Sequence, residues 1–199
     1  MARKYIAPSE VTPIRVQTGK VKLIGSHVFR PASLHIPDVP IRPEYSATFL
    51  IPKSDTKTVS EIKCAIDSIL KERKGTSQDT WMPLRDGDEM NPFGIVNPAH
   101  ANCYVLSAKS SKKPKIVDLE NKEITDESKI YPGCFVRLIL RFYPFDFEPW
   151  GPLLYGVGCL LNAIQKIEDA EPIEKRADLE AVPCDLLVPD WVNRELKQL

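Results

Sequence analysis

The stretch Cys134–Trp150 reads CFVRLILRFYPFDFEPW and has the apolar character of a buried strand, yet it contains Arg137 and Arg141. Alternate residues of a strand share a face. One face of this stretch therefore carries Val136, Leu138, Leu140 and Phe142. The opposite face carries Arg137, Ile139, Arg141, Tyr143 and Phe145. Because charged side chains are rarely buried without partners, the pattern predicts a strand with one core face and one exposed face of arginines and aromatic rings.

Other runs of strand length occur along the chain, separated by many of its 18 prolines. Their alternating or continuously apolar character predicts strands at residues 20–30, 44–52, 102–110, 114–119 and 153–167. Pro144 indicates a bend or the end of central pairing in the first stretch. Gly156 and Gly158 indicate a strand that another part of the chain approaches closely.

One helix is expected, at about residues 59–74. Thr58 and Glu61 have the spacing of a capping box, apolar residues follow at helical intervals, and Gly75 marks the end. Five or six strands with one inserted helix predict a mainly β barrel with long proline-rich loops. A doubly wound α/β fold would need helices alternating with strands throughout.

A chain of 199 residues suits one domain with appendages. We predict an N-terminal arm over 1–19, a barrel over 20–167 and an acidic C-terminal extension over 168–199. Residues 168–190 hold eight acidic and two basic residues, a balance of −6, whereas residues 1–167 hold 23 basic and 18 acidic residues, a balance of +5. The body and the extension can therefore attract each other.

The composition excludes several classes of protein. Hydrophobic residues make up 43% and charged residues 27%, as in soluble globular proteins. No apolar run approaches the roughly 20 residues of a membrane span, and no apolar signal follows the N-terminus, so we expect a cytoplasmic protein without membrane contact. The five cysteines form no CxxC pair, which predicts reduced thiols rather than disulfides or a zinc site.

The arginine and aromatic face of Cys134–Trp150 is typical of surfaces that bind single-stranded nucleic acid. Guanidinium groups hold phosphates, and each aromatic ring that stacks on a base contributes about 1–3 kcal/mol. A solvated strand face, with its arginines paired to acids, is the alternative reading.

The strand expected at 20–30 adds two candidate phosphate contacts, Lys20 and Lys22. Its alternation places Lys20, Lys22, Ile24, Ser26, Val28 and Arg30 on one face, opposite Val21, Leu23 and Phe29. The same lysines also fit the solvated side of a first strand.

The stretch WMPLRDGDEMNPFG (81–94) is rich in turn residues and predicts a loop. Trp81 and Arg85 would make it a mobile flap that covers a bound strand. Asp86, Asp88 and Glu89 are candidate cation ligands, but they lack the further ligands of an EF-hand loop. We therefore expect a structural or solvated turn, with no metal site and no cofactor.

No motif favours an enzyme. The chain lacks the GxxxxGK[ST], GxGxxG and GxSxG patterns. A metal-dependent nuclease would have to rely on Asp86 and Asp88 and is the least favoured alternative. The main alternative is a protein-interaction module, in which Phe147 and Trp150 extend the aromatic face into a hydrophobic interface.

Several segments together carry a family resemblance. In chain order they are YSATFLIPK (45–53), PLRDGDE (83–89), YPGC (131–134), FVRLILRFYPFD (135–146) and GVGCLLNAIQ (156–165). From about Lys20 to Pro172 the chain resembles a family of phage-encoded single-stranded DNA-binding proteins, first catalogued as a domain of unknown function and later placed among the OB-folds. The resemblance implies an OB-fold barrel that coats single-stranded DNA in phage replication or recombination. It also implies little sequence preference, no catalysis and a location in the host cytoplasm.

The candidate DNA-binding residues are Lys20, Lys22, Arg85, Arg137, Arg141, Tyr143, Phe145 and Trp81. Proteins of this class often end in an acidic tail that competes with DNA and recruits replication or recombination partners. Here the acidic segment 168–190 is followed by WVNRELKQL (191–199), a departure from that pattern. The segment either acts as a decoy for the basic groove or folds back onto the barrel or a second subunit of a homodimer, through Leu186, Leu187, Val188 and Trp191.

Overall fold

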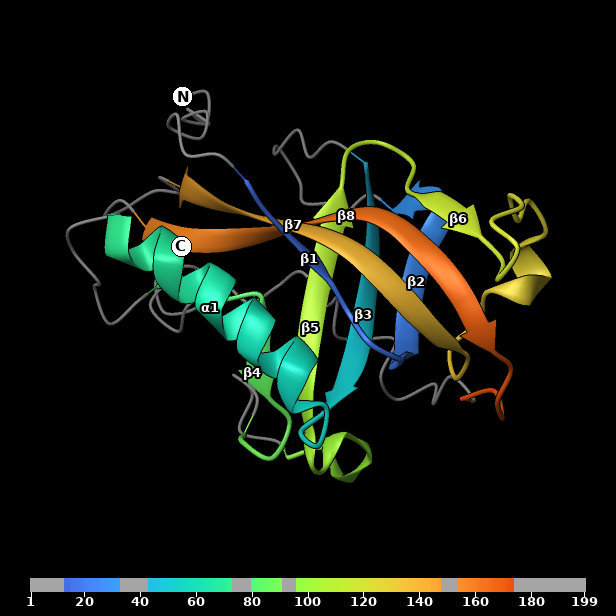
Figure 1. Ribbon diagram of the computed structural model, residues 1–199, viewed down its shortest axis with the longest axis horizontal. Coiled ribbons are helices and arrows are strands. Elements are labelled where there is room, and N and C mark those ends of the chain that lie inside the picture. The colour runs from blue at the N-terminus through green and yellow to red at the C-terminus, as the bar shows by residue number, and fades with distance from the viewer. Residues whose placement is uncertain (1–12, 33–42, 73–79, 91–95, 148–153, 174–199) are drawn as a thin grey trace, which may run out of the picture.

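The computed structural model describes residues 13–32, 43–72, 80–90, 96–147 and 154–173 (Figure 1). Its elements are β1 (Ile14–Gln17), β2 (Val21–Ala32), β3 (Glu44–Pro52), α1 (Thr56–Glu72), β4 (Leu84–Asp86), η1 (Pro98–His100), β5 (Cys103–Ser110), β6 (Lys115–Val117), η2 (Glu127–Lys129), β7 (Phe135–Phe147) and β8 (Leu154–Glu168). No helix of this part of the chain is long and apolar enough to cross a membrane. All six expected strands and the expected helix are present, with small shifts at their ends.

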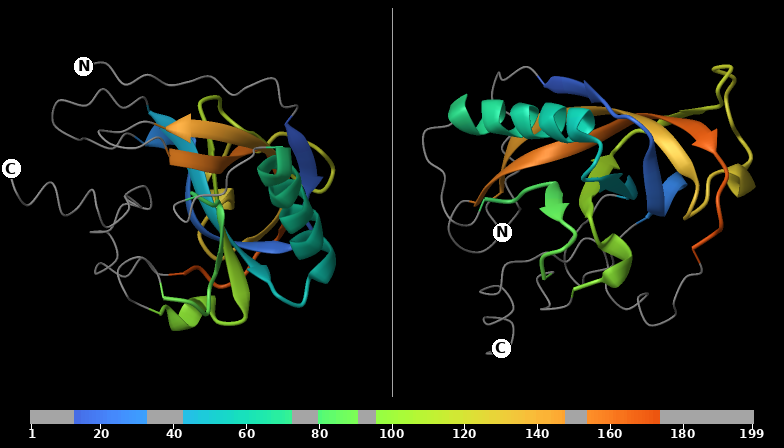
Figure 2. Two further views of the ribbon diagram at one scale, coloured as in Figure 1. Left: turned by 90° about the vertical axis from the view of Figure 1, so that its left-hand side faces the viewer. Right: turned by 60° about the horizontal axis from the view of Figure 1, so that its bottom comes forward.

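Five strands close into a barrel in the order β7–β2–β3–β5–β8, with β8 returning to β7. All pairs in this circuit are antiparallel except β5 with β8, which run parallel. A small closed barrel of this kind is an OB-fold, so the predicted mainly β barrel with one inserted helix is confirmed. Figure 2 shows the strands around a common interior, with α1 along one side.

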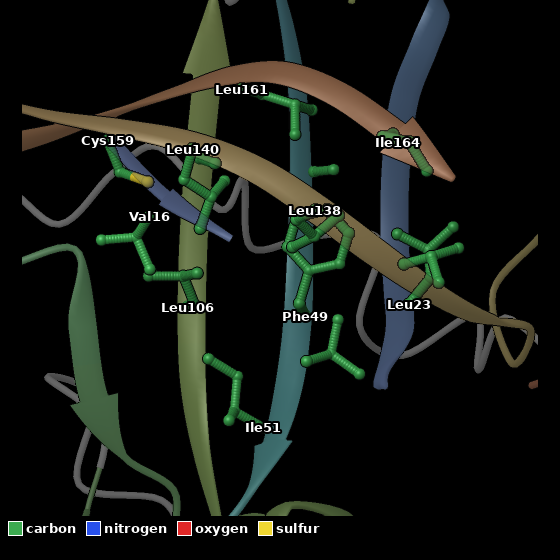
Figure 3. Packing of buried hydrophobic residues seen from close by; sticks show 14 of the residues in the cluster. Val16, Leu23, Phe49, Ile51, Leu106, Leu138, Leu140, Cys159, Leu161 and Ile164 are labelled. Atoms are coloured by element: carbon green, nitrogen blue, oxygen red, sulfur yellow. The ribbon is translucent and has the colours of Figure 1, made fainter. Parts of the chain in front are cut away.

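The barrel interior is filled by the alternate side chains of the strands. Leu23 of β2, Phe49 of β3, Leu106 of β5, Leu138 of β7 and Leu161 of β8 point into it from different sides (Figure 3). The predicted core face of β7 is fully buried, at 0% exposure for Val136, Leu138, Leu140 and Phe142. One side of α1 completes the core through Ile62, Ala65, Ile66 and Ile69.

Residues 14–17 differ from the irregular arm expected at the N-terminus, because they form strand β1 along β7. The connection that follows is fixed at both ends. The backbone N–H of Thr18 donates to the carbonyl of Leu138 at 3.1 Å, and the Thr18 hydroxyl accepts the N–H of Leu138 at 3.0 Å. The N–H of Gly19 donates to the hydroxyl of Thr58 at 2.8 Å. β1 is therefore tied to the barrel through Thr18 and to α1 through Gly19.

The start of α1 corrects the expected capping box. The Asp55 carboxylate accepts the N–H of Thr58 at 3.1 Å, and the Asp55 carbonyl accepts the N–H of Val59 at 3.0 Å. Asp55 is therefore the N-cap, and Thr58 lies inside the first turn with its hydroxyl engaged by Gly19. Gly75, the expected end of the helix, lies outside the described residues.

One further expectation about strands is wrong, and one is confirmed. The register between β2 and β3 shifts between Leu23 and Gly25, and an extra residue in a strand reverses which side the following side chains face. Val28 is therefore buried at 1% exposure instead of sharing the face of Lys22. Pro144 lies beyond Phe142, the last residue of β7 that is paired with β1, and within the described residues it is paired only with Val157 of β8. The expected end of central pairing is therefore confirmed, although β7 continues along β8 to Phe147.

Replacing Thr58 with Val removes the acceptor for the Gly19 N–H while keeping the shape of a buried side chain. We expect the free energy of unfolding to fall by about 1–3 kcal/mol, because a buried donor loses its partner. Urea denaturation followed by circular dichroism measures this. Thr58→Ser keeps the hydroxyl and should retain more stability; equal stability of the Val variant and the wild type would contradict the role of this contact.

Candidate nucleic-acid interface

The outer face of β7 carries the residues that the sequence predicts for nucleic-acid binding. Arg137 and Arg141 are exposed, while Ile139, Tyr143 and Phe145 are half-buried. Nη1 of Arg137 donates to Oε1 of Gln165 on β8 at 3.4 Å. The predicted division of β7 into a core face and an exposed face is thus confirmed.

The rings of Tyr143 and Phe145 lie across glycines of β8. Tyr143 is paired with Gly158, and Phe145 with Gly156. A Cβ atom on Gly158 would lie 2.3 Å from Cζ of Tyr143, and a Cβ atom on Gly156 would lie 2.6 Å from the ring of Phe145. The close approach indicated by these glycines in the sequence is therefore made by the two rings. Glycine is required here because any side chain would displace them.

Trp81 joins these two rings from a different part of the chain. Its carbonyl accepts the N–H of Val157 at 3.0 Å, which holds it beside β8. The ring centroids of Trp81 and Phe145 are 5.6 Å apart with an interplanar angle of 69°, and those of Phe145 and Tyr143 are 6.4 Å apart at 51°. These are the tilted and edge-to-face arrangements that aromatic rings favour. We call Trp81, Tyr143 and Phe145 the aromatic cluster; all three side chains are partly exposed.

The segment that contains Trp81 and Arg85 is not a mobile flap over the residues described, 80–90. β4 is paired with β5, with Arg85 opposite Val105, and the N–H of Ser107 donates to the carbonyl of Pro83 at 3.0 Å. Direct pairing of β5 with β8 is recorded only at Lys109 and Leu160. Trp81 therefore attaches this segment to β8, and β4 attaches it to β5. Main-chain hydrogen bonds hold both attachments.

The Asp86–Asp88 turn is an ion-pair site. Nζ of Lys53 lies 2.6 Å from Oδ1 of Asp86 and 2.7 Å from Oδ2 of Asp88. The N–H of Asn102 donates to Oδ1 of Asp88 at 2.8 Å, and the N–H of Gly87 donates to the carbonyl of Cys103 at 2.8 Å. Hydrogen bonds from Lys53 lower the pKa of both carboxyl groups and raise the pKa of Lys53 itself.

The PLRDGDE segment thus fastens β4 to the end of the β3–β5 pair. Within the described part of the chain, no cluster of three or more His, Cys, Asp or Glu side chains could hold a metal ion.

Lys20, Lys22 and Arg85 lie apart from the aromatic cluster in register. Lys22 is paired with Leu50 on one side and Phe135 on the other, Leu50 is paired with Val105, and Val105 with Arg85. Lys22 and Arg85 therefore stand in one row across the outside of β2, β3, β5 and β4. Lys20 forms an ion pair with Glu168 and lies 4.3 Å above the Phe135 ring.

The start of the acidic extension packs against the YPGC segment. The Tyr131 hydroxyl donates to the Asp169 carboxylate at 2.7 Å, and the N–H of Ile173 donates to the carbonyl of Pro132 at 2.9 Å. Gly133 has φ +116°, and a Cβ atom there would lie 2.3 Å from the carbonyl oxygen of Glu171. Leu186, Leu187, Val188 and Trp191 lie outside the described residues, as do Trp150 and the side chain of Phe147.

Arg15 is the residue of this surface that the sequence reading missed. It lies on β1 directly opposite Arg141 and is exposed. The sequence feature that indicates a strand here is the alternation of apolar and polar residues in IRVQ (14–17), in which Ile14 and Val16 face inward. Four residues are a short run, and the neighbouring prolines favoured an irregular arm.

An OB-fold barrel with arginines and partly exposed rings on its outer surface defines a class of nucleic-acid-binding proteins. Residues 14–182 match the family described as the single-stranded DNA-binding protein of Enterobacter phage Enc34, and the chain belongs to this family. The expected family is thereby confirmed.

The chain is also similar to a phage relative in sequence and to solved structures in fold. Putative protein p50 of Acyrthosiphon pisum secondary endosymbiont phage 1 is 29% identical over 140 residues, covering 64% of this chain and 71% of the relative. The single-stranded DNA-binding protein from bacteriophage Enc34, solved in complex with single-stranded DNA, superposes with a TM-score of 0.65 at 21% identity, over 83% of this chain and 97% of that one. The single-stranded DNA-binding protein gp2.5 encoded by bacteriophage T7 superposes with a TM-score of 0.53 at 14% identity, over 81% of this chain and 96% of that one. The superpositions show a shared fold.

Gly158→Ala tests whether the position of Tyr143 matters for binding. The new methyl group would overlap the Tyr143 ring and push it off the β8 backbone. We expect binding of single-stranded DNA to weaken by about 1 kcal/mol or more, the lower range of one stacked base. Gly25→Ala is the matched control, because nothing lies within 4 Å of its added Cβ. Equal affinities of the two variants for a labelled oligo-dT would show that Tyr143 takes no part.

The Lys53 turn predicts a dependence of stability on pH. Because Lys53 lowers the pKa of Asp86 and Asp88 below the ordinary 3.8, the stabilisation from their ionised forms is fully present above about pH 4. It is lost as the pH falls from there through the lowered pKa values of the folded state. Melting temperatures between about pH 5 and pH 2 should therefore fall less steeply in Lys53→Met, which lacks the ammonium group. Parallel curves for the two proteins would contradict this prediction.

Proposed function

We propose that this chain binds single-stranded DNA without catalysis, through the outer face of β7 and the aromatic cluster. Arg137, Arg141 and Lys22 hold backbone phosphates, while Tyr143 and Phe145 stack on bases. Trp81 adds a third ring, and Lys20 and Arg85 are secondary phosphate contacts at the edges of this surface.

The observation that carries the proposal is the composition of one continuous strand face. Arg137 and Arg141 are exposed on the same side of β7 as two rings that lie over β8 glycines. No acidic residue occurs in Ile14–Gln17, in residues 135–145 or in β8 before Glu168. A backbone that follows this face from Arg137 to Phe145 meets cations and ring surfaces. The acids of β7 and β8, Asp146 and Glu168, lie outside this stretch. Family membership supports the same ligand.

Single strands should bind better than duplexes, for a geometric reason. Stacking on Tyr143 or Phe145 needs a base whose flat surface is exposed, and in a duplex these surfaces are covered by neighbouring bases. The phosphates of a duplex can still be attracted to the arginines, since that attraction does not depend on base exposure. The rings therefore account for the preference and the cations for much of the affinity.

The biological setting follows from the family and is part of the proposal. A protein with little base readout coats exposed single strands during phage replication or recombination, in the cytoplasm of the host. Replication or recombination proteins are the expected partners of the acidic segment 168–190. The structure describes residues 168–173 of that segment. The first of them, Glu168, forms an ion pair with Lys20. A phosphate that binds Lys20 would have to displace Glu168.

The test is fluorescence anisotropy of a labelled oligo-dT at several salt concentrations, with duplex DNA of equal length as the comparison. If three to five phosphates are held, log K should fall with log salt with a slope of about −2 to −3.5. Arg137→Ala/Arg141→Ala should weaken binding and make the slope less negative by up to about 1.4, which corresponds to two lost phosphate contacts. Lys71→Ala/Lys129→Ala removes the same charge from exposed positions on α1 and η2 and is the control.

Binding to the single strand by the wild type, weakened by the arginine pair and not by the control, would support the proposal. Absence of binding by the wild type and by a variant lacking residues 168–199 would overturn it and favour a protein-interaction module. Binding that is restored by the deletion would identify the extension as an inhibitor of the same surface.

A further inference from the structure

The pairing of β1 with β7 places two positive charges directly opposite each other. Arg15 is paired with Arg141, flanked by Ile14 with Phe142 and Val16 with Leu140. Because Phe142 and Leu140 are fully buried, the alternation sends both arginines to the outside, where both are exposed. Directly opposed residues of an antiparallel pair have Cβ atoms about 5 Å apart.

Like charges in this position are unfavourable, and nothing described nearby compensates them. Opposed like charges destabilise a strand pair. Among the contacts recorded for the described residues, neither Arg15 nor Arg141 forms an ion pair or a hydrogen bond with an acidic side chain. The neighbours of the pair in register are Gln17 on β1, Ile139 on β7 and Leu160 on β8. An anion placed between the guanidinium groups would remove the repulsion.

The position of Arg15 is also fixed, which a binding residue needs. β1 is followed by Thr18, which exchanges two hydrogen bonds with Leu138, and by Gly19, which is bonded to Thr58 of α1. β1 therefore cannot shift its register along β7 without breaking these contacts. The backbone positions of Arg15 and Arg141 therefore stay directly opposite each other whether or not a ligand is bound.

We propose that Arg15 and Arg141 form one shared phosphate site, which makes β1 part of the DNA-contacting surface. Planar guanidinium groups hold phosphate through paired hydrogen bonds, and two of them can hold one phosphodiester from opposite sides. This inference rests on the proposed function and adds to it a residue and a stoichiometry of two arginines to one phosphate. Tyr143 follows Arg141 by two residues on the same face, so a strand held at this site has its next base within reach of the aromatic cluster.

The test uses three variants: Arg15→Gln, Arg141→Gln and the double variant that carries both changes. The control is Lys129→Gln, which removes one charge from an exposed site on η2. Oligo-dT affinity is measured by anisotropy from 0.05 to 0.3 M salt, and melting temperature by circular dichroism. One phosphate contact contributes about −0.7 to the slope of log K against log salt. Its contribution to affinity is therefore about fivefold at 0.1 M salt relative to 1 M salt. We expect Arg15→Gln and Arg141→Gln each to lose a large part of that factor. The affinity of the double variant should fall by less than the product of the two single-variant factors, because the two arginines share one phosphate.

Stability provides a readout that separates binding from folding. Removing one of two opposed charges should leave the melting temperature of Arg15→Gln unchanged or raise it, while its affinity falls. A lower melting temperature together with weaker binding would overturn the proposal, because Arg15 would then have a structural role.

Two further outcomes would also overturn the shared site. If the wild type binds and Arg15→Gln binds like Lys129→Gln, Arg15 is not a contact, although the proposed function still stands. If the losses of the single variants multiply in the double variant, the two arginines hold separate phosphates. Failure of the wild type to bind in any form would instead overturn the proposed function itself.

Discussion

The two-faced strand β7 is the constraint on which the rest of the molecule depends. Its inward side chains are fully buried from Val136 to Phe142, and it is paired with β8 along one edge and with β1 and β2 along the other. Because successive side chains point to opposite faces, burying this apolar set leaves Arg137 and Arg141 on the outside. The core and the proposed binding surface are thus two sides of one strand, and neither can change register without the other.

The second constraint is the absence of side chains at two positions of β8. Gly156 and Gly158 give Phe145 and Tyr143 room to lie across the β8 backbone. With these glycines the rings are held by the sheet and by each other, and Trp81 is held against them through its hydrogen bond to Val157. A prearranged group of rings loses less side-chain freedom on binding than separate flexible rings would. The glycines therefore serve the surface rather than the core.

Polar contacts of the PLRDGDE and YPGC segments fasten parts of the described chain together. Lys53 joins the two carboxylates of the PLRDGDE turn and thereby holds β4 beside β5. The YPGC segment has a similar role, because the Tyr131 hydroxyl donates to Asp169 at the start of the acidic extension. Both motifs carry the family resemblance, and in this chain both have contacts that explain their residues.

The sequence by itself determined the strands, the barrel class and the two faces of β7, because the period-two pattern of a long strand has only one way to bury its apolar side. Only the tertiary structure decided the remaining features. It converted the predicted flap around Trp81 and Arg85 into paired main chain, and a bulge near Gly25 turned Val28 inward. It also placed Arg15 opposite Arg141. These outcomes depend on which segments become neighbours in the sheet, and contacts between separate segments of the chain leave no local pattern in the sequence.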